Sequence, residues 1–217
     1  MTSYSQRTGR VPPLSLVEKV SPKPSAAHTP ATPLHEHIVQ LFDAPRSLAD
    51  AVSQFLIEGR ALGNKLLVIA RAAHWTLVEG YLERRGFPVG DPSTPLTVVD
   101  ARKLRSRITR RGVLDPKSMH ETLGDMVEQL AAQPGGLRVY CELVELFAEE
   151  GAFDQAATLE DYWNHLGEQS AFTLLCGYSA AHFADPRHAH NLREICSRHT
   201  SVRSQSADSL GTWLTNR

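Results

Sequence analysis

The sequence predicts an α/β fold in which helices cover both faces of a mainly parallel sheet. Short β-rich runs alternate with helical patterns along most of the chain, which is typical of such a sheet. One run, Lys65–Ala70, is almost continuously apolar, as expected for a strand covered on both faces. The 41% hydrophobic and 22% charged residues are the balance of a globular protein.

The first predicted strand is His37–Phe42, and a turn separates it from a helix. Pro45 makes the turn, because proline cannot extend the strand and disfavours helix in the residue before it. We expect Ser47 to cap the helix, with Asp50 in its first turn, where a carboxylate suits the positive helix end. Gly63 then ends the helix in a left-handed conformation.

The alternation continues beyond Ala70. The remaining predicted elements are a helix at Trp75–Arg85, a strand at Leu96–Val99, a helix opened by Asp115 and Pro116, a strand at Leu137–Cys141, helices at Leu143–Glu150 and Asp154–Gln169, a strand at Phe172–Cys176 and a helix opened by Asp185 and Pro186. Ligands of parallel sheets bind beyond the carboxyl ends of the strands. That rule directs attention to Phe42–Arg46, Arg71–His74, Asp100, Glu142 and Gly177–Phe183.

The 217 residues suffice for one domain with additional terminal segments. Residues 1–34 are rich in proline, serine and threonine, so we predict a disordered arm, either a docking segment or a passive tail. The domain is expected to span residues 35–202, with a tail at 203–217.

Composition and charge exclude several classes of protein. A net charge of −1 makes nucleic acid an unlikely general partner. Three widely spaced cysteines do not form a secreted disulfide framework. No apolar run is long enough for a membrane span and no signal sequence is recognisable, so we expect a cytoplasmic protein.

The sequence lacks the common phosphate-binding and nucleophile motifs. G-x-x-x-x-G-K-[ST], G-x-G-x-x-G and G-x-S-x-G are all absent. The string from Gly59 to Leu66 has the wrong spacing and runs from a helix into a strand. Triphosphate hydrolysis by the usual machinery is therefore not expected.

Ten histidines raise the question of a metal site. His182, His188, His190 and His199 lie in the same part of the sequence as Cys176 and Cys196, yet no C-x-x-C, H-x-x-x-H or H-E-x-x-H pair sets two ligands on one helical face. We therefore interpret these residues as surface histidines and buried cysteines, and expect no metal and no cofactor. A zinc site is the alternative.

A basic string forms a second candidate surface. Its six cations are Arg102, Lys103, Arg105, Arg107, Arg110 and Arg111. They could grip phosphates or an acidic partner, but the string has no interleaved aromatic residues. A solvated basic face is the preferred interpretation, with nucleic-acid contact as the alternative.

Several motifs in a fixed order resemble one family. They are His37-Ile38, Phe42, Gly63-x-Lys65-Leu-Leu-Val-Ile-Ala70, His74, Glu142-Leu-Val-Glu-Leu146, Leu159-Glu160-x-x-Trp163-Asn164-x-Leu166, Phe172-x-Leu-Leu-Cys176-x-Tyr178 and Cys196-x-x-His199. Together, from about His37 to Val202, they are similar to the MEDS family, the methanogen/methylotroph sensory domain of prokaryotic regulators, which includes a dichloromethane-responsive repressor.

The resemblance implies a degenerate RecA-like domain of the circadian-clock type, a three-layer α/β/α sandwich lacking a phosphate loop. In that comparison His37–Arg46 takes the place of the phosphate loop, and Arg71–His74 the place of the catalytic carboxylates. The resemblance also implies sensing of a small, often methyl- or hydrocarbon-related ligand, with the signal passed to kinase or DNA-binding domains. No such output domain is recognisable in this sequence, so we expect action in trans.

The candidate ligand-binding residues are His37, Asp43, Arg46, His74, Glu142, Glu160, Trp163, Asn164, Cys176 and Tyr178. Glu142 directly follows a buried strand, so its carboxylate must meet a cation, a donor or a ligand. Glu160 and Asn164 share one helical face. Each candidate also has a structural interpretation: an ion pair for Glu142, helix anchoring for Glu160 and Asn164, and core packing for Cys176.

The sequence thus predicts a non-catalytic sensory or regulatory protein that binds a small ligand or a signalling partner. The partner would be a histidine kinase, a sigma-factor regulator or a transcription factor, and a homodimer is conceivable. The alternatives are a nucleotide-binding or hydrolytic enzyme with a cryptic site, and a nucleic-acid-binding regulator acting through Arg102–Arg111.

Overall fold

A computed structural model describes residues 36–204 of the chain. The expected arm at residues 1–34 and all of the expected tail beyond residue 204 lie outside this range. In the described part, six parallel strands form one sheet in the order β3-β2-β6-β7-β1-β8. The strands are β1 (Glu36–Phe42), β2 (Lys65–Ala70), β3 (Leu96–Asp100), β6 (Leu137–Cys141), β7 (Phe172–Ser179) and β8 (Ser201–Ser204).

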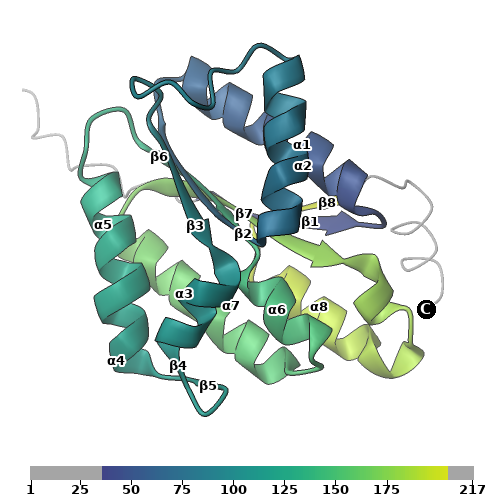
Figure 1. Ribbon diagram of the computed structural model, residues 1–217. Coiled ribbons are helices and arrows are strands. Elements are labelled where there is room, and N and C mark those ends of the chain that lie inside the picture. Colours follow the sequence, from purple (N-terminus) through teal and green to yellow (C-terminus); the bar gives the residue numbers. More distant parts are fainter. Residues whose placement is uncertain (1–35, 205–217) are drawn as a thin grey trace, which may run out of the picture. The chain divides into compact units, whose positions relative to one another are not determined.

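Helices cover both faces of this sheet, which confirms the predicted fold class (Figure 1). One face carries α1 (Pro45–Ala61) and α2 (Ala72–Arg84). The other carries α3 (Ala101–Ile108), α4 (Pro116–Met119), the π-helical turn η1 (His120–Gly124), α5 (Asp125–Ala131), α6 (Leu143–Glu149), α7 (Phe153–Gln169) and α8 (Ala189–Ser197). Short 3₁₀ turns, η2 (Ala180–Phe183) and η3 (Pro186–His188), precede α8, and a small hairpin joins β4 (Thr109–Arg110) to β5 (Val113–Leu114).

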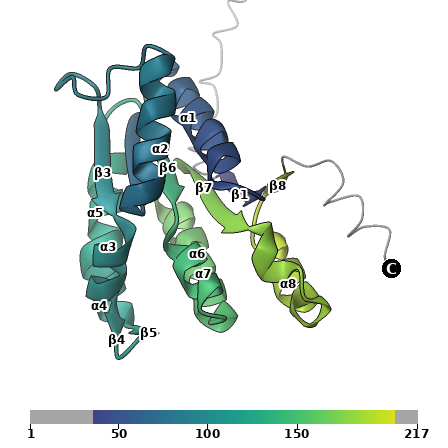
Figure 2. The same cartoon turned by 45° about the vertical axis from the view of Figure 1, so that its right-hand side comes forward.

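The strand order explains which helix covers which face. The two connections β1–α1–β2 and β2–α2–β3 run toward the β3 edge, whereas all later connections run toward the β8 edge. Crossovers between parallel strands are right-handed, so connections that run in opposite directions lie on opposite faces. The turned view in Figure 2 shows the same division, with α1 and α2 on one side of the strands and α6, α7 and α8 on the other.

Two hydrophobic cores result, one on each face of the sheet. The smaller packs Ile38, Val68 and Leu175 against α1 and α2. The larger core lies on the opposite face of the same strands, where residues such as Val39 and Leu174 pack against α3 and α5–α8. Residues alternate between the two cores along each strand, as the period of two requires.

The first helix begins earlier than predicted. It starts at Pro45, and Ser47 lies inside it, where its hydroxyl donates to the Ala44 carbonyl at 2.7 Å. The predicted capping roles of Ser47 and Asp50 are therefore wrong. Proline is favoured at the first helical position, where its fixed φ suits the helix and no N–H is needed.

The first four cations of the basic string lie in the helix α3, which the sequence analysis did not predict. Asp100 caps α3 by accepting the Lys103 N–H at 2.8 Å, and Ala101, Leu104 and Ile108 are buried beneath it. The many charged residues between these three positions hid the helical spacing of the apolar residues in the sequence.

In the last third of the chain, the boundaries of several elements differ from the predicted ones. The predicted strand Phe172–Cys176 continues through Ser179, because β7 pairs with β1 as far as Phe42. Asp185 caps only the turn η3, and α8 follows it. The short edge strand β8 was not predicted; its four residues are too few to show a pattern.

Candidate functional site

A polar network occupies the carboxyl ends of β2 and β6, on the side of α2. Its centre is Glu142, whose side chain has no solvent exposure. The carboxylate accepts hydrogen bonds from the Arg71 backbone N–H at 2.8 Å and from the Tyr140 hydroxyl at 2.7 Å. It also lies 3.2 Å from Arg71 Nε and 2.7 Å from His74 Nδ1. Because β2 and β6 are paired, the residues that follow them meet at one edge of the sheet.

These partners keep Glu142 ionised. Burial raises the pKa of Glu142, but the hydrogen bond and charge of His74, the Arg71 N–H and the Tyr140 hydroxyl together hold it below its usual value. The same contact acts on Tyr140: its burial and the neighbouring Glu142 raise the pKa of the Tyr140 phenol well above the ordinary range. Glu142 is thus a buried anion whose charge is matched within the fold.

Arg71 extends the network to the helix α6. Its guanidinium lies 3.7 Å from Glu145 and 3.3 Å from Glu149, while its side chain is 14% exposed. Glu145 in turn accepts the Ser179 N–H at 2.9 Å and lies 3.0 Å from His182 Nε2. The hydrogen bond to Glu145 raises the pKa of His182. One arginine and two histidines therefore face three carboxylates across the ends of β2, β6 and β7.

The turn between β1 and α1 does not join this network. Asp43 and Arg46 are exposed, and neither contacts Glu142 in the structure as described. The N–H groups of Ser47 and Leu48 are both satisfied by the Ala44 carbonyl, and Pro45 has none. The turn offers no row of free N–H donors for a phosphate.

A second polar cluster lies on the other face of the sheet, beneath α7. His37 of β1, Cys176 of β7 and Glu160 of α7 meet there with fully buried side chains. His37 Nε2 lies 3.0 Å from Glu160 Oε2, and the Cys176 sulfur lies 3.5 Å from each of these atoms. The second oxygen, Glu160 Oε1, accepts the Tyr178 hydroxyl at 2.8 Å and lies 3.4 Å from His199 Nε2.

Both imidazole rings of this cluster are held in place by contacts to their Nδ1 atoms. Asn164 Oδ1 lies 2.9 Å from His37 Nδ1, and Asn164 Nδ2 donates to the Arg198 carbonyl at 3.0 Å. His199 Nδ1 lies 2.8 Å from the Ile195 carbonyl. The two rings contact one another with centroids 4.0 Å apart. We refer to His37, Glu160, Cys176 and His199 as the buried quartet.

Burial and charge shift the acidities in the quartet in opposite directions. Burial raises the pKa of Glu160, but His199 and His37 outweigh it and hold that pKa well below the usual value. Burial, together with the neighbouring Cys141 and Glu160, raises the pKa of the Cys176 thiol well above its usual range. Burial and Glu160 do the same to the Tyr178 phenol. At neutral pH the folded protein therefore holds a Glu160 carboxylate beside a protonated Cys176.

The sequence-predicted residues thus separate into three groups. His74 and Glu142 lie at the carboxyl edge, whereas His37, Glu160, Asn164, Cys176 and Tyr178 meet on the face under α7; Asp43 and Arg46 join neither set. Cys176 and Tyr178 lie within β7 rather than at its end. Trp163 belongs to the larger core, where it packs edge-on against Phe172 with ring centroids 6.0 Å apart.

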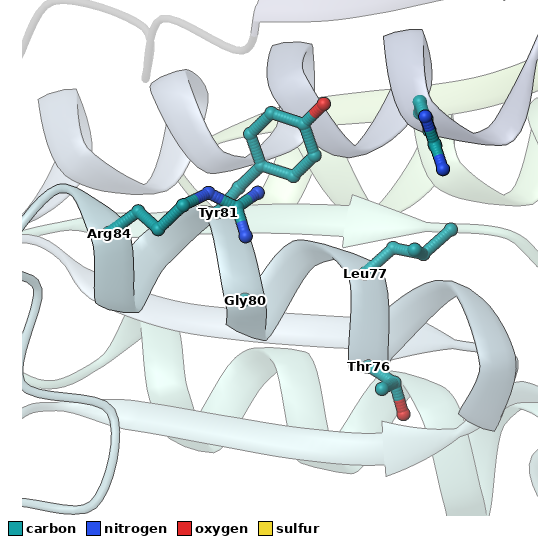
Figure 3. A pocket seen from close by; sticks show the side chains of 6 residues that line it. Thr76, Leu77, Gly80, Tyr81 and Arg84 are labelled. Atoms are coloured by element: carbon teal, nitrogen blue, oxygen red, sulfur yellow. The ribbon is translucent and has the colours of Figure 1, made fainter.

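A pocket of about 300 Å³ lies elsewhere, on the outer side of α2 (Figure 3). Tyr81 and Arg84 line it, with the Arg84 guanidinium 4.4 Å from the Tyr81 ring centroid, and Arg46 is the only predicted site residue that contributes. Neither Glu142 nor Glu160 reaches it. The pocket is remote from the chemistry of both polar clusters.

The basic string is partly neutralised by acidic neighbours. Arg102 pairs with Glu149, Arg105 with Glu150 and Arg110 with Asp115. Arg105 also covers the Phe147 ring at 4.6 Å. Within residues 36–204, Lys103, Arg107 and Arg111 have no acidic side chain at ion-pair distance, and all three are exposed.

The candidate ligand-binding residues omitted six side chains of the two polar clusters: Arg71, Tyr140, Glu145, Glu149, His182 and His199. Of these, His182 and His199 were considered as ligands only for a zinc site. Tyr140 lies two residues before Glu142, which directly follows β6. His199 follows Cys196 by three residues, but its partners come from β1, α7 and β7. Only the tertiary fold brings these segments together, so local spacing could not reveal the quartet.

No helix within residues 36–204 is long and apolar enough to cross a membrane. A search of the curated proteins returned no match. A family model described as the methanogen/methylotroph, DcmR sensory domain, abbreviated MEDS, matches residues 36–200. That match covers nearly all of the described fold, including both polar clusters, and the chain therefore belongs to the MEDS family of sensory domains.

Proposed function

We propose that the protein is a non-catalytic sensory and regulatory protein that binds a small ligand or a signalling partner at the carboxyl edge of its sheet. The observation that supports this most strongly is the network around Glu142. Its central carboxylate is fully buried, whereas Arg71 and His74 are each 14% exposed. A ligand can therefore reach both of these side chains without entering the core.

The network also connects elements that a signal would have to move. Arg71 and His74 belong to the start of α2, whereas Glu145 and Glu149 belong to α6 on the opposite face. A ligand that competes for Arg71 or His74 leaves Glu142 with fewer partners, and an uncompensated buried charge costs several kcal/mol. Relief of that cost by a shift of α2 against α6 would carry the signal to a regulatory protein.

The charge at this edge argues against a nucleotide as the ligand. Three carboxylates, Glu142, Glu145 and Glu149, already share one arginine and two histidines there, so a triphosphate would add negative charge to a site with three anions. In the β1–α1 turn, Pro45 has no N–H, and the Ala44 carbonyl already accepts the N–H groups of Ser47 and Leu48. Small neutral or cationic compounds, such as methylated one-carbon compounds, suit the site better and agree with the family description.

The acidities support a role in binding rather than catalysis. A general acid or base works best with a pKa near the working pH. The pKa values of Glu142 and Glu160 are lowered, whereas those of Tyr140, Cys176 and Tyr178 are raised well above neutrality. These five groups are therefore fixed in one protonation state each.

The output partner in this proposal is a histidine kinase, a sigma-factor regulator or a transcription factor, and the cytoplasm is the proposed location. Native mass spectrometry of the protein from its own host would detect a co-purifying small molecule or protein. It would also show whether the chain forms a homodimer.

A thermal-shift experiment tests the proposed site. The full chain is screened with ATP, GTP and cyclic dinucleotides, each with Mg²⁺, and with methanol, methylamines and dichloromethane. A compound that binds the native state raises the unfolding temperature. We expect no shift and no hydrolysis with the nucleotides, and a shift with a one-carbon compound.

The variants Glu142→Gln and Glu168→Gln localise the effect. The first keeps the shape of the side chain but removes the central charge, whereas Glu168 is 76% exposed on α7 and belongs to neither polar cluster. The ligand-induced shift should disappear in Glu142→Gln and persist in Glu168→Gln, with both variants folded by circular dichroism. Strong stabilisation by ATP with release of phosphate would contradict the proposal.

A further inference from the structure

We propose that the buried quartet of His37, Glu160, Cys176 and His199 is a zinc site. Its ligand-type atoms are two imidazole nitrogens, one sulfur and one carboxylate oxygen, and they all lie within 4.8 Å of one another. This proposal replaces the expectation, drawn from local sequence spacing, that the chain holds no metal.

The separations suit tetrahedral coordination. Bond lengths of about 2.0–2.3 Å around zinc place neighbouring ligand atoms roughly 3.3–3.8 Å apart. The observed separations are 3.0 Å for His37 Nε2 to Glu160 Oε2, 3.5 Å from Cys176 Sγ to each of these atoms, and 3.4 Å for His199 Nε2 to Glu160 Oε1. Only small side-chain movements are needed to bring four donors onto one ion.

The groups behind the ligands fix both histidines in the tautomer that a metal requires. The Ile195 carbonyl can only accept, so Nδ1 of His199 carries the proton and Nε2 is left with a lone pair. The Arg198 carbonyl holds the Asn164 amide nitrogen, so the amide oxygen faces Nδ1 of His37 and accepts its proton. Histidine ligands of metals are commonly anchored in this way.

One ligand atom lacks the hydrogen bond that its burial demands. His199 Nε2 is inaccessible to solvent and has no hydrogen-bond partner within residues 36–204, although Glu160 Oε1 lies 3.4 Å away. A nitrogen lone pair aimed at a carboxylate oxygen is unfavourable unless a proton or a metal ion lies between them. A metal ion shared by both groups satisfies this requirement.

The charge and softness of the donors favour zinc. A Zn²⁺ ion with one thiolate and one carboxylate is neutral as a unit, which removes the cost of an isolated buried charge. Thiolate and imidazole ligands together select zinc over magnesium or calcium. Binding converts the Cys176 thiol into a zinc-bound thiolate and releases its proton.

The four ligands fill the tetrahedron, so the site is structural rather than catalytic. It would tie the turn before β8 to β1, α7 and β7, whereas β8 itself pairs, within residues 36–204, with β1 alone. His199 has a buried side chain but a partly exposed backbone, so an ion can enter by movement of this turn.

Metal analysis of the purified full chain tests the proposal first. The protein is stripped with a chelator, incubated with Zn²⁺ or Co²⁺ and desalted. We expect about one equivalent of zinc per chain, and for cobalt a thiolate-to-metal charge-transfer band with the strong visible bands of tetrahedral coordination. A folded chain that retains no zinc and gives no cobalt spectrum overturns the proposal.

Matched cysteine variants locate the metal. Cys176→Ser should abolish the charge-transfer band, whereas Cys196→Ser, outside the quartet, should leave it unchanged. Asn164→Ala should keep the band but weaken zinc binding about 10–100-fold, because Asn164 only positions His37. If the band survives in Cys176→Ser or disappears in Cys196→Ser, the ion is bound elsewhere and the proposal is wrong.

Discussion

The two buried carboxylates are stabilised by different kinds of partner. Glu142 has a guanidinium, a backbone N–H, an imidazole and a phenol around it, and two of these partners, Arg71 and His74, reach the surface. Glu160 has two imidazoles, a thiol and a phenol, all enclosed. Removal of a single partner from such a group is costly, because the remaining charge stays buried.

The Tyr178 hydroxyl provides a direct measure of that cost. Replacement by phenylalanine in Tyr178→Phe removes the 2.8 Å hydrogen bond to Glu160. Hydrogen bonds to charged groups contribute about 1.5–3 kcal/mol, so we expect the free energy of unfolding to fall by that amount. Urea denaturation monitored by circular dichroism gives the value.

Tyr162→Phe is the matched control. The Tyr162 hydroxyl is also inaccessible, but it has no hydrogen-bond partner among residues 36–204. Its removal should therefore leave stability unchanged or slightly higher. Equal losses in the two variants would show that ring packing, and not the contact with Glu160, is measured.

His182 makes stability depend on pH near neutrality. The hydrogen bond to Glu145 raises the pKa of His182 above its ordinary 6.5. A group whose pKa is higher in the folded state contributes stability that is complete below its unfolded pKa and is lost as the pH rises through its folded pKa. We therefore expect the contribution of His182 to decline above about pH 6.5.

The variant His182→Gln should remove this contribution, so its free energy of unfolding should decline less than that of the wild type as the pH rises from 6 to about 8. Urea titrations across this interval measure both slopes. The exposed His190, replaced in His190→Gln, is the control and should leave the wild-type slope. An undiminished slope in His182→Gln would mean that another group causes it.

At the scale of elements, the turns fix where the strands begin. Gly63 and Gly135 both have positive φ, and their turns lie against one another. The Asn64 side chain donates to the Gly135 carbonyl at 2.6 Å, and the Lys65 N–H donates to the Gly136 carbonyl at 2.9 Å. The starts of β2 and β6 are thus aligned by backbone contact.

The contact leaves no room for a side chain at Gly135. A Cβ there would lie 2.2 Å from the Gly63 carbonyl oxygen, in addition to the strain of φ +105°. Gly151→Ala has a similar positive φ of +73° but open space, so it reports the backbone strain alone, about 1–2 kcal/mol. Gly135→Ala should lose clearly more in a urea titration, and equal losses would show that the two turns are not in contact.

Sequence reasoning predicted elements best where an apolar pattern and a cap coincide. The strands Lys65–Ala70 and Leu137–Cys141 have the predicted limits, and Asp115 caps its helix by accepting the Ser118 N–H at 2.9 Å. The helix α3 was missed because its three buried positions stand among four cations. The strand β8 was missed because its place depends on pairing with β1, which no local pattern encodes.

At the scale of the whole molecule, the fold class followed from the sequence but the strand order did not. Alternation of strands and helices is a local property, whereas β1 lies between β7 and β8 through contacts more than a hundred residues apart in sequence. Within the quartet, His37 is likewise more than a hundred residues away in sequence from the other three members. Seven candidate residues lie in the two polar clusters. Only the tertiary structure shows which of them lie at the carboxyl edge of the sheet and which lie on the face under α7.

The short link between β1 and α1 constrains how this scaffold could be redesigned. Only Asp43 and Ala44 separate the two elements, and Pro45 begins the helix. A triphosphate cradle needs a glycine-rich loop of about eight residues with successive free amides. Point substitutions here cannot create one, so an engineer who wished to install nucleotide hydrolysis would have to lengthen the backbone itself by insertion.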